Sequence, residues 1–588
     1  MSAAPTTTNT DPSGAASAGA GAGDGLTLFP PRRGRAFGFN PLLVKGFRGR
    51  VRRRHLLTWG VVTLTLAAFI SLIIYTVLTQ QRQVPAETAA RAVLPGLVVL
   101  QAVIMMMSGT GAVAAGIARE RDGGLLDYHR MTPMRPASAI FGSLFGLAAR
   151  EYALFAITMP LVIIAAVIGN ISPLTLLHFY VVFFTSVLVY HMTALVAGTV
   201  TKRPRAAQMM SVGLVVLLYF VLPNLSRVGL TFFEFLTIRP TFMGLVMNEL
   251  PEEIRVGVEA RGLDSFQPVP LFESTLHPTA YSLVVQVFVF AAMFSIVHRR
   301  WRNPVAHLFS KGGAFVIFGG ISTFLLASVW AIVRQDQAYN DIFGPLNAMT
   351  LDAGEQVDRI PQTLEALLIL MTFLLGGAWV LLVAAITPSR QRMVEAWRWA
   401  AKNDRLTLAP NSDGASSRIA ALAMLVVFLA SLTSVMILAA RGGQYFASGP
   451  SFVATIAFVL GVVGTALYVQ GLRERFGLRG FSMMLFLGWA IPFFGMMIIL
   501  AAFDYASGAL AMGMPFPAVH QSLSIASLLE SCEPFAGQTR RFMPDEVAPD
   551  AVEFTWAGAL GTMAFGVWMQ TLAARERSRR RLAGLDAA

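Results

Sequence analysis

The sequence predicts an all-α fold, a polytopic transmembrane helical bundle of about twelve spans with cytoplasmic N- and C-termini. Hydrophobic residues make up 55% of the 588 residues and charged residues 13%, whereas soluble domains carry about 25% charged residues. Apolar stretches long enough to cross a bilayer alternate with short polar loops. Arg and Lys lie almost entirely in every second loop, which marks those loops as cytoplasmic.

The net charge of +13 at pH 7 follows from the same pattern. In a soluble protein this excess would suggest a nucleic-acid partner. Here the basic residues flank apolar stretches, where the anionic lipids of the cytoplasmic leaflet attract them. We therefore expect the lipid bilayer to be the partner of these charges, and no nucleic acid. The single cysteine, Cys532, excludes a disulfide within the chain.

The chain divides into five predicted regions. Residues 1–37 are mainly small and polar and are expected to form a disordered tail. An amphipathic interfacial helix follows at 38–56, a six-span unit at 57–300, a second six-span region at 301–574 and a basic cytoplasmic tail at 575–588. The expected spans are 57–78, 94–118, 139–168, 173–200, 208–225, 278–297, 313–333, 362–386, 419–440, 452–471, 481–502 and 553–573.

The interfacial helix is predicted from a start signal and a two-sided pattern. An asparagine followed by proline is typical of a helix N-terminus. Apolar residues then recur every fourth position, and basic residues occupy the other faces. The residues of this helix are Asn40, Pro41, Leu43, Lys45, Phe47 and Arg48. The alternative is a solvated basic linker.

Two long extracytoplasmic segments and a weak repeat complete the outline. Segment 226–277 is apolar but contains Pro240, which predicts short interfacial or re-entrant helices. Segment 503–552 is rich in proline and is expected to be ordered only in pieces. Asn303 and Pro304 precede the seventh span as Asn40 and Pro41 precede the first, which suggests a pseudo-dimer of two halves within one chain.

The loop after the second span has the most informative motif. A helix that ends in Arg-Glu-Arg-Asp is broken by Gly123 and Gly124, restarts at two leucines and stops at Pro133. This pattern predicts a short cytoplasmic helix between two spans, suited to docking in a groove of another protein. The alternative is an ordinary tight connector with charged flanks.

At these residues the chain resembles the ABC-2-type permeases, the membrane subunits of ATP-binding cassette exporters. The match covers about residues 38–300 and includes the interfacial helix. The residues that match the family pattern are Glu120, Gly123, Leu125, Leu126, Thr132 and Pro133. Together with Arg121 and Tyr128 they make up the predicted ATPase-coupling loop. Gly124 departs from the usual threonine, and the Tyr128-His129 pair replaces a commoner apolar residue.

The resemblance implies a permease that forms the translocation path in the plasma (inner) membrane of a bacterium. A separate cytoplasmic ATPase would bind ATP and supply the driving force, and the permease would act as a homodimer or pseudo-dimer. No Gly, four residues, Gly-Lys-Ser/Thr motif occurs in the sequence, so we expect a transport subunit without its own cofactor or enzymatic activity. No His/Asp/Glu set with metal-ligand spacing falls on one predicted helix face.

Three polar residues are candidate intramembrane sites, namely Arg150, Glu151 and His191. If the third helix begins near Pro136, Arg150 lies about 20 Å along it and needs a partner. Because adjacent helical residues do not face each other, we expect Arg150 and Glu151 not to pair together. In the alternative interpretation, residues 137–150 lie along the interface and the span begins at Tyr152.

Two other classes of function stay open. A secondary transporter driven by an ion gradient needs broken helices or buried carboxylates, and Pro160, Pro223 and Pro492 are candidate break points. A membrane-embedded lipid-linked transferase needs outer carboxylates, but the first outer loop holds only Glu87. The scarcity of charges in the spans favours a lipid-like or hydrophobic passenger.

Overall fold

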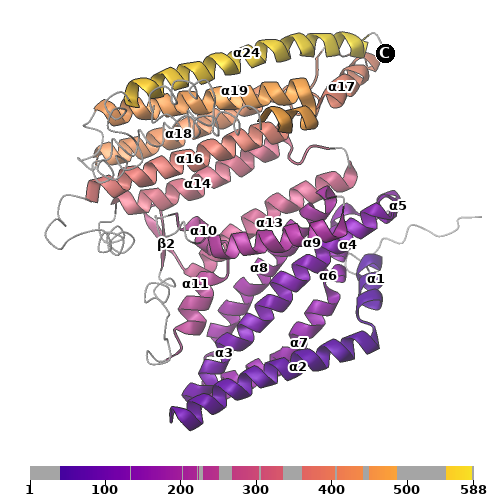
Figure 1. Cartoon of the computed structure of the whole chain (residues 1–588), viewed down its shortest axis with the longest axis vertical. Coiled ribbons are helices and arrows are strands. Elements are labelled where there is room, and N and C mark those ends of the chain that lie inside the picture. Colours follow the sequence, from indigo (N-terminus) through magenta and orange to yellow (C-terminus); the bar gives the residue numbers. More distant parts are fainter. Residues whose placement is uncertain are drawn as a thin grey trace, which may run out of the picture. The chain divides into compact units, whose positions relative to one another are not determined.

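A computed structural model describes residues 40–132, 134–201, 203–221, 223, 230–250, 268–303, 306–334, 360–403, 405, 407–441, 449–485 and 551–585. These residues are mostly helical (Figure 1). The predicted tail at 1–37, nearly all of the segment 503–552 and most of the expected span 481–502 lie outside them.

The helices of the first region follow one another with short breaks. They are α1 (Pro41–Arg50), α2 (Arg53–Thr76), α3 (Ala86–Ala102), α4 (Thr110–Asp122), α5 (Leu125–Met131), α6 (Pro136–Leu147), α7 (Ala149–Ile168), α8 (Pro173–Val200), α9 (Pro204–Val216) and α13 (Pro278–Arg302). π-Helical turns continue four elements, at η1 (Val77–Gln81), η2 (Val103–Gly109), η3 (Leu217–Val221) and η5 (Phe242–Met247).

The second region contains α14 (Lys311–Arg334), α16 (Ile360–Ile386), α17 (Arg390–Lys402), α18 (Arg418–Arg441), α19 (Gly449–Leu485) and α24 (Ala551–Leu585). Within α19, Gly477 has a φ of 67°, a left-handed conformation that bends the helix there. The predicted basic tail 575–588 continues α24 as helix to Leu585.

Six helical runs among the described residues are long and apolar enough to cross a membrane. They are Arg53–Gln81, Ala86–Asp122, Ala149–Ile168, Pro173–Val200, Pro278–Arg302 and Lys311–Trp330. Each overlaps a segment that the hydropathy pattern predicts as a span. The protein is therefore a helical membrane protein, while the count of twelve spans and the orientation of the termini stay predictions.

The third predicted span is divided into two helices. Residues 139–168 were expected to form one helix, but Ala148, with φ −104° and ψ 14°, separates α6 from α7. The alternative, in which residues 137–150 lie along the interface and the span begins at Tyr152, comes closer to the observed break. Neither glycine nor proline stands at Ala148, so no local signal marks it.

The predicted interfacial helix at 38–56 is also shorter than expected. α1 begins at Pro41, as the start signal indicates, but ends at Arg50, and α2 begins at Arg53. Its most buried residue is Leu42, whereas Leu43 is half-buried and Phe47 and Arg48 are exposed. The buried face of α1 is set by a close crossing with α6, where a side-chain carbon at Gly46 would lie 2.4 Å from the Cα of Gly146.

The segment before α13 contains the expected short helices and an unexpected hairpin. The helices are α10 (Phe232–Phe235) and α11 (Arg239–Thr241), which leads into η5. Strands β1 (Val269–Leu271) and β2 (Ser274–Leu276) pair antiparallel through a tight turn, in which Phe272 has a φ of 55°. The all-α prediction is wrong at these few residues, because hydropathy alone does not report a short hairpin.

The predicted repeat does not extend to the segment before α14. Asn303 is the C-cap of α13, and its backbone N–H donates to the Arg299 carbonyl. Residues 306–310 are not helical, so the described part of this segment contains no counterpart of α1, and Pro304 lies outside the described residues. The pseudo-dimer therefore stays a prediction with less local support.

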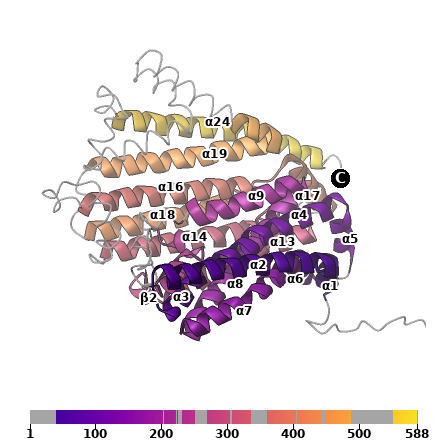
Figure 2. The ribbon, with the colours of Figure 1, turned by 60° about the horizontal axis from the view of Figure 1, so that its bottom comes forward.

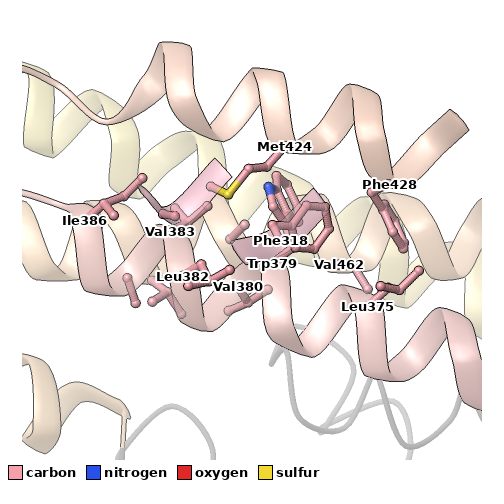
Figure 3. Close-up of a cluster of buried hydrophobic side chains, with 14 of the residues drawn as sticks. Phe318, Leu375, Trp379, Val380, Leu382, Val383, Ile386, Met424, Phe428 and Val462 are labelled. Atoms are coloured by element: carbon pink, nitrogen blue, oxygen red, sulfur yellow. The ribbon is translucent and has the colours of Figure 1, made fainter. Parts of the chain in front are cut away.

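A hydrophobic core holds α14, α16, α18 and α19 together (Figure 3). The Trp379 ring of α16 stacks on Phe428 of α18 with centroids 6.4 Å apart. Its indole N–H donates to the Ala421 carbonyl at 3.1 Å, so the polar atom of this large side chain is satisfied. Phe318 of α14 and Val462 of α19 are buried in the same cluster.

Helices α19 and α24 lie side by side along much of their length (Figures 1 and 2). Glycines permit this approach, because a side-chain carbon at Gly566 would lie 2.5 Å from the Gly464 carbonyl oxygen. Small residues at a helix interface are typical of packing in membranes, where close van der Waals contact replaces the hydrophobic effect.

Replacing Gly566 with leucine should therefore separate α19 from α24. We expect the Gly566→Leu variant to lose about 1–3 kcal/mol of unfolding free energy, as overpacked sites do. The matched control is Gly377→Leu in α16, where nothing lies within 4 Å of an added side-chain carbon. Thermal denaturation followed by size-exclusion chromatography measures both. Equal losses in the two variants would contradict the close crossing.

Candidate functional site

The loop between α4 and α5 has the helix break that the sequence predicts. α4 ends at Asp122, Gly123 caps it, and α5 runs from Leu125 to Met131. Gly124 has a φ of 70°, a left-handed conformation that costs other residues about 1–2 kcal/mol. This conformation explains why glycine, and not threonine, stands at that position.

α5 has one buried and one exposed face. Leu126 is 1% exposed and packs in a cluster with Ile117, Leu144 and other apolar residues. Tyr128 and Met131 are 61% and 78% exposed, and Leu125 is also exposed. The interpretation of Leu126 as a docking residue is wrong, because its side chain holds α5 against the protein's own core.

Polar contacts fix the position of α5. The Arg130 guanidinium donates to Asp127 at 2.6 Å and to the Arg300 carbonyl of α13 at 3.2 Å. The Thr132 hydroxyl donates to the His129 carbonyl at 2.7 Å and closes the last turn of the helix. Pro133 lies outside the described residues. A direct hydrogen bond thus joins α5 to α13.

A second tether joins α5 and α4 to α1. The Lys45 ammonium donates to the Glu120 carboxylate at 2.9 Å and lies 3.3 Å from Nε2 of His129. Two residues predicted for different elements, the interfacial helix and the coupling loop, thus form one ion pair. Lys45 is half-exposed, so the pair contributes less to stability than to the relative position of the helices.

Arg121 caps a helix instead of facing a partner. Its guanidinium donates to the carbonyl of Thr199 at 2.8 Å and to that of Thr201 at 3.4 Å. These carbonyls lie at the C-terminus of α8 and have no partner within the helix, and a cation there is favourable. Arg121 is therefore a structural residue that links α4 to α8.

Arg150 and Glu151 do pair with each other, so the expectation that they do not is wrong. Arg150 Nη2 lies 2.6 Å from Glu151 Oε1, and Nε also donates to this oxygen at 3.1 Å. The break at Ala148 places both residues in the first turn of α7, and their two side chains bend toward each other there. Arg150 also lies over the Trp59 ring, 5.9 Å from its centroid.

His191 is buried and fully engaged. Its Nε2 lies 3.1 Å from the Met105 carbonyl in η2, and Nδ1 lies 3.4 Å from the Tyr152 hydroxyl. The carbonyl accepts only, so the ring proton is assigned to Nε2, and Nδ1 accepts from tyrosine. A side-chain carbon at Gly109 would lie 2.7 Å from Nε2, so glycine admits the ring at the end of η2.

Two amide side chains that the sequence analysis did not single out organise further polar contacts between helices. Gln101 donates to the Thr158 hydroxyl at 2.9 Å and accepts from the Tyr180 hydroxyl at 2.8 Å. Gln286 donates to the Ser186 hydroxyl at 2.8 Å and accepts from Thr185. A single glutamine within an apolar stretch is the sequence signal that could have predicted these polar contacts between helices.

Comparison with known proteins gives no relative: no family, no curated protein and no solved structure matches the chain. Among the described residues, no group of three or more His, Cys, Asp or Glu side chains is placed to hold a metal ion. The site is therefore defined by its geometry: a tethered α5 with one exposed apolar face.

Lowering the pH should loosen α5. Burial has the largest effect and lowers the pKa of His129 from 6.5; Glu120 opposes this shift and Lys45 adds to it. Below about pH 6.5, the unfolded segment therefore binds more protons than the folded one. The contribution of neutral His129 to the stability of α5 is fully present above that pH, and it is lost as the pH falls through the folded pKa of His129. Hydrogen–deuterium exchange of residues 125–131 measures the opening.

The His129→Gln variant should lack this pH dependence. The exposed His55 of α2 provides a matched control, and His55→Gln should retain it. If α5 opens equally at all pH values in the unsubstituted protein, His129 does not contribute to the tether.

Proposed function

We propose that this chain is the membrane permease subunit of an ATP-driven exporter of the ABC-2 type. It would form the translocation path in the bacterial inner membrane and couple to a separate cytoplasmic ATPase, on which ATP binds. The observation that carries this proposal is α5, a short helix that exposes apolar side chains while its other face is anchored to the protein.

The exposed face of α5 is suited to a protein partner. Leu125, Tyr128 and Met131 lie at positions i, i+3 and i+6 of the helix and are all exposed. An apolar stripe of this spacing is how a short helix occupies a groove of another protein. Tyrosine is also enriched among the residues that dominate binding energy at interfaces.

The anchored face of α5 supports coupling rather than simple attachment. Leu126 packs in the core, Arg130 contacts α13, and the Lys45–Glu120 pair joins the same end of α4 to α1. A force on α5 therefore reaches α1, α4 and α13 through direct contacts. These helices lead into candidate spans, so a movement of the partner would reach the membrane region.

The charge pattern places this site in the cytoplasm under the proposed topology. The loop that contains α5, the end of α13 and the end of α24 all carry several arginines, and basic loops stay on the cytoplasmic side. The sequence contains no phosphate-binding loop of its own, which fits the division into permease and ATPase. A pair of ATPase copies fits the proposed homodimer or pseudo-dimer.

A secondary transporter is the second candidate. It is favoured by the interrupted second span, where the π-helical η2 supplies the Met105 carbonyl to His191. However, both nitrogens of His191 already have partners within the protein, and Glu151 is paired with Arg150. The ATP-driven permease is therefore the better-supported function.

The first test is loss of the apolar face of α5. Leu125→Asp with Met131→Asp should leave the protein folded and inserted, because both side chains are exposed, but should weaken ATPase binding about 30-fold or more. Tyr128→Phe retains the ring and should retain binding. Copurification of a soluble nucleotide-binding subunit from native membranes is the measurement.

The control is Leu126→Asp, which should destabilise the protein itself because it buries a charge. The chain purified alone should neither bind nor hydrolyse ATP. Transport that survives ATP depletion and follows a proton or sodium gradient would establish the secondary transporter instead.

A charge exchange tests the tether between α1 and α4. Lys45→Glu and Glu120→Lys should each lower the ATPase rate of the reconstituted complex, because each places like charges together. The double variant restores opposite charges and should recover most of the rate. The stability of all three should change less than the rate does, because the Lys45 side chain is half-exposed. Normal rates in both single variants would show that the ion pair has no part in coupling.

A further inference from the structure

A cavity of about 410 Å³ with mixed polar and apolar walls lies where α13 ends and α14 begins. Nearly all of its lining comes from residues 295–313, and Asp413 is the one lining residue from outside this range. Its polar lining residues are Ser295, His298, Arg299, Arg302, Asn303, Ser310 and Asp413. The coupling site at α5 does not use this cavity.

The charges of the cavity favour an anion. Burial opposes ionisation of Asp413, but the hydrogen bond and charge of Arg299, with further help from Arg392, hold the pKa of Asp413 below its ordinary value. The carboxylate is thus charged and paired with the two arginines. Arg302 is exposed, lines the same cavity and adds a further positive charge. A phosphate group binds such guanidinium donors.

The exposed face of α13 changes from apolar to polar toward this cavity. Val284, Val287 and Ala291 are exposed at three- and four-residue spacing, and Ser295 and Arg302 continue the same face into the cavity. Val287 to Ser295 spans about 12 Å along the helix. One leaflet of hydrocarbon is about 15 Å thick, half of the membrane core. The apolar part of this face thus corresponds to the acyl chain of a single lipid, and the cavity at its end corresponds to the headgroup.

We propose that this cavity binds the headgroup phosphate of an anionic phospholipid of the cytoplasmic leaflet, with an acyl chain along the apolar part of the same α13 face. Basic pockets between helices on the cytoplasmic side are where such headgroups bind. A free phosphate would use only the charged end, whereas the lipid uses the continuous face. The assignment rests on the cytoplasmic placement of this end of α13 and not on the identity of a transport partner.

The test compares two lipids with identical oleoyl chains, phosphatidylglycerol and phosphatidylcholine. Native mass spectrometry of the full chain in detergent should show preferential binding of phosphatidylglycerol. Arg302→Gln should reduce this preference about fivefold, the effect of one charge near a membrane surface, and Arg302→Lys should retain it. Arg302 is not part of the Arg299–Asp413 ion pair, so we expect its substitution to leave the local fold intact.

The matched control is Arg205→Gln, an exposed arginine of α9 outside the cavity, which should behave as the unsubstituted protein. The proposal is overturned if phosphatidylglycerol has no advantage, or if Arg205→Gln and Arg302→Gln lose it equally, which would indicate diffuse surface attraction. It is also overturned if glycerol 3-phosphate, a headgroup without chains, competes as well as the lipid does.

Discussion

A backbone amide or carbonyl within a bilayer has no water to bind, so its partner must come from the protein. The same need arises for any carbonyl that the protein buries at a helix end or in a loop outside the bilayer. At η2 the Met105 carbonyl accepts from His191, and at the end of α8 two carbonyls accept from Arg121. Before α18, the Lys311 ammonium donates to three carbonyls of one loop, those of Pro410, Ser412 and Ala415.

The same side chains also connect helices that are distant in sequence. Arg121 joins α4 to α8, His191 joins α8 to η2, and Lys311 joins α14 to the loop that precedes α18. Each contact completes a helix end or a loop and fixes a neighbouring element at once. The tethers of α5 follow this pattern, since Arg130 donates to a carbonyl at the end of α13.

Close crossings supply the remaining constraint. Association of helices in lipid depends on tight packing, because lipid chains are as apolar as leucine. Gly46 against Gly146, Gly198 against Ile117 and Gly464 against Gly566 are contacts in which a side chain would meet the neighbouring helix. These crossings fix the rotation of α1, α8 and α24 and thereby decide which residues of each helix face the protein.

The sequence by itself determined the properties that depend on local composition. Hydropathy gave the membrane class and the positions of the helical spans that are described, and the break at Gly123 and Gly124 followed from the conformational freedom of glycine.

The tertiary structure decided the rest. The sequence did not show which leucine of α5 is buried, since Leu125 and Leu126 are chemically identical and only the neighbouring core distinguishes them. Nor did the sequence reveal the pairing of Arg150 with Glu151, because the helix break at Ala148, just before both residues, has no glycine or proline to mark it. Lys45 and Glu120 lie 75 residues apart, and only the tertiary structure brings their charges together, because contacts at that separation depend on how the helices between them are packed.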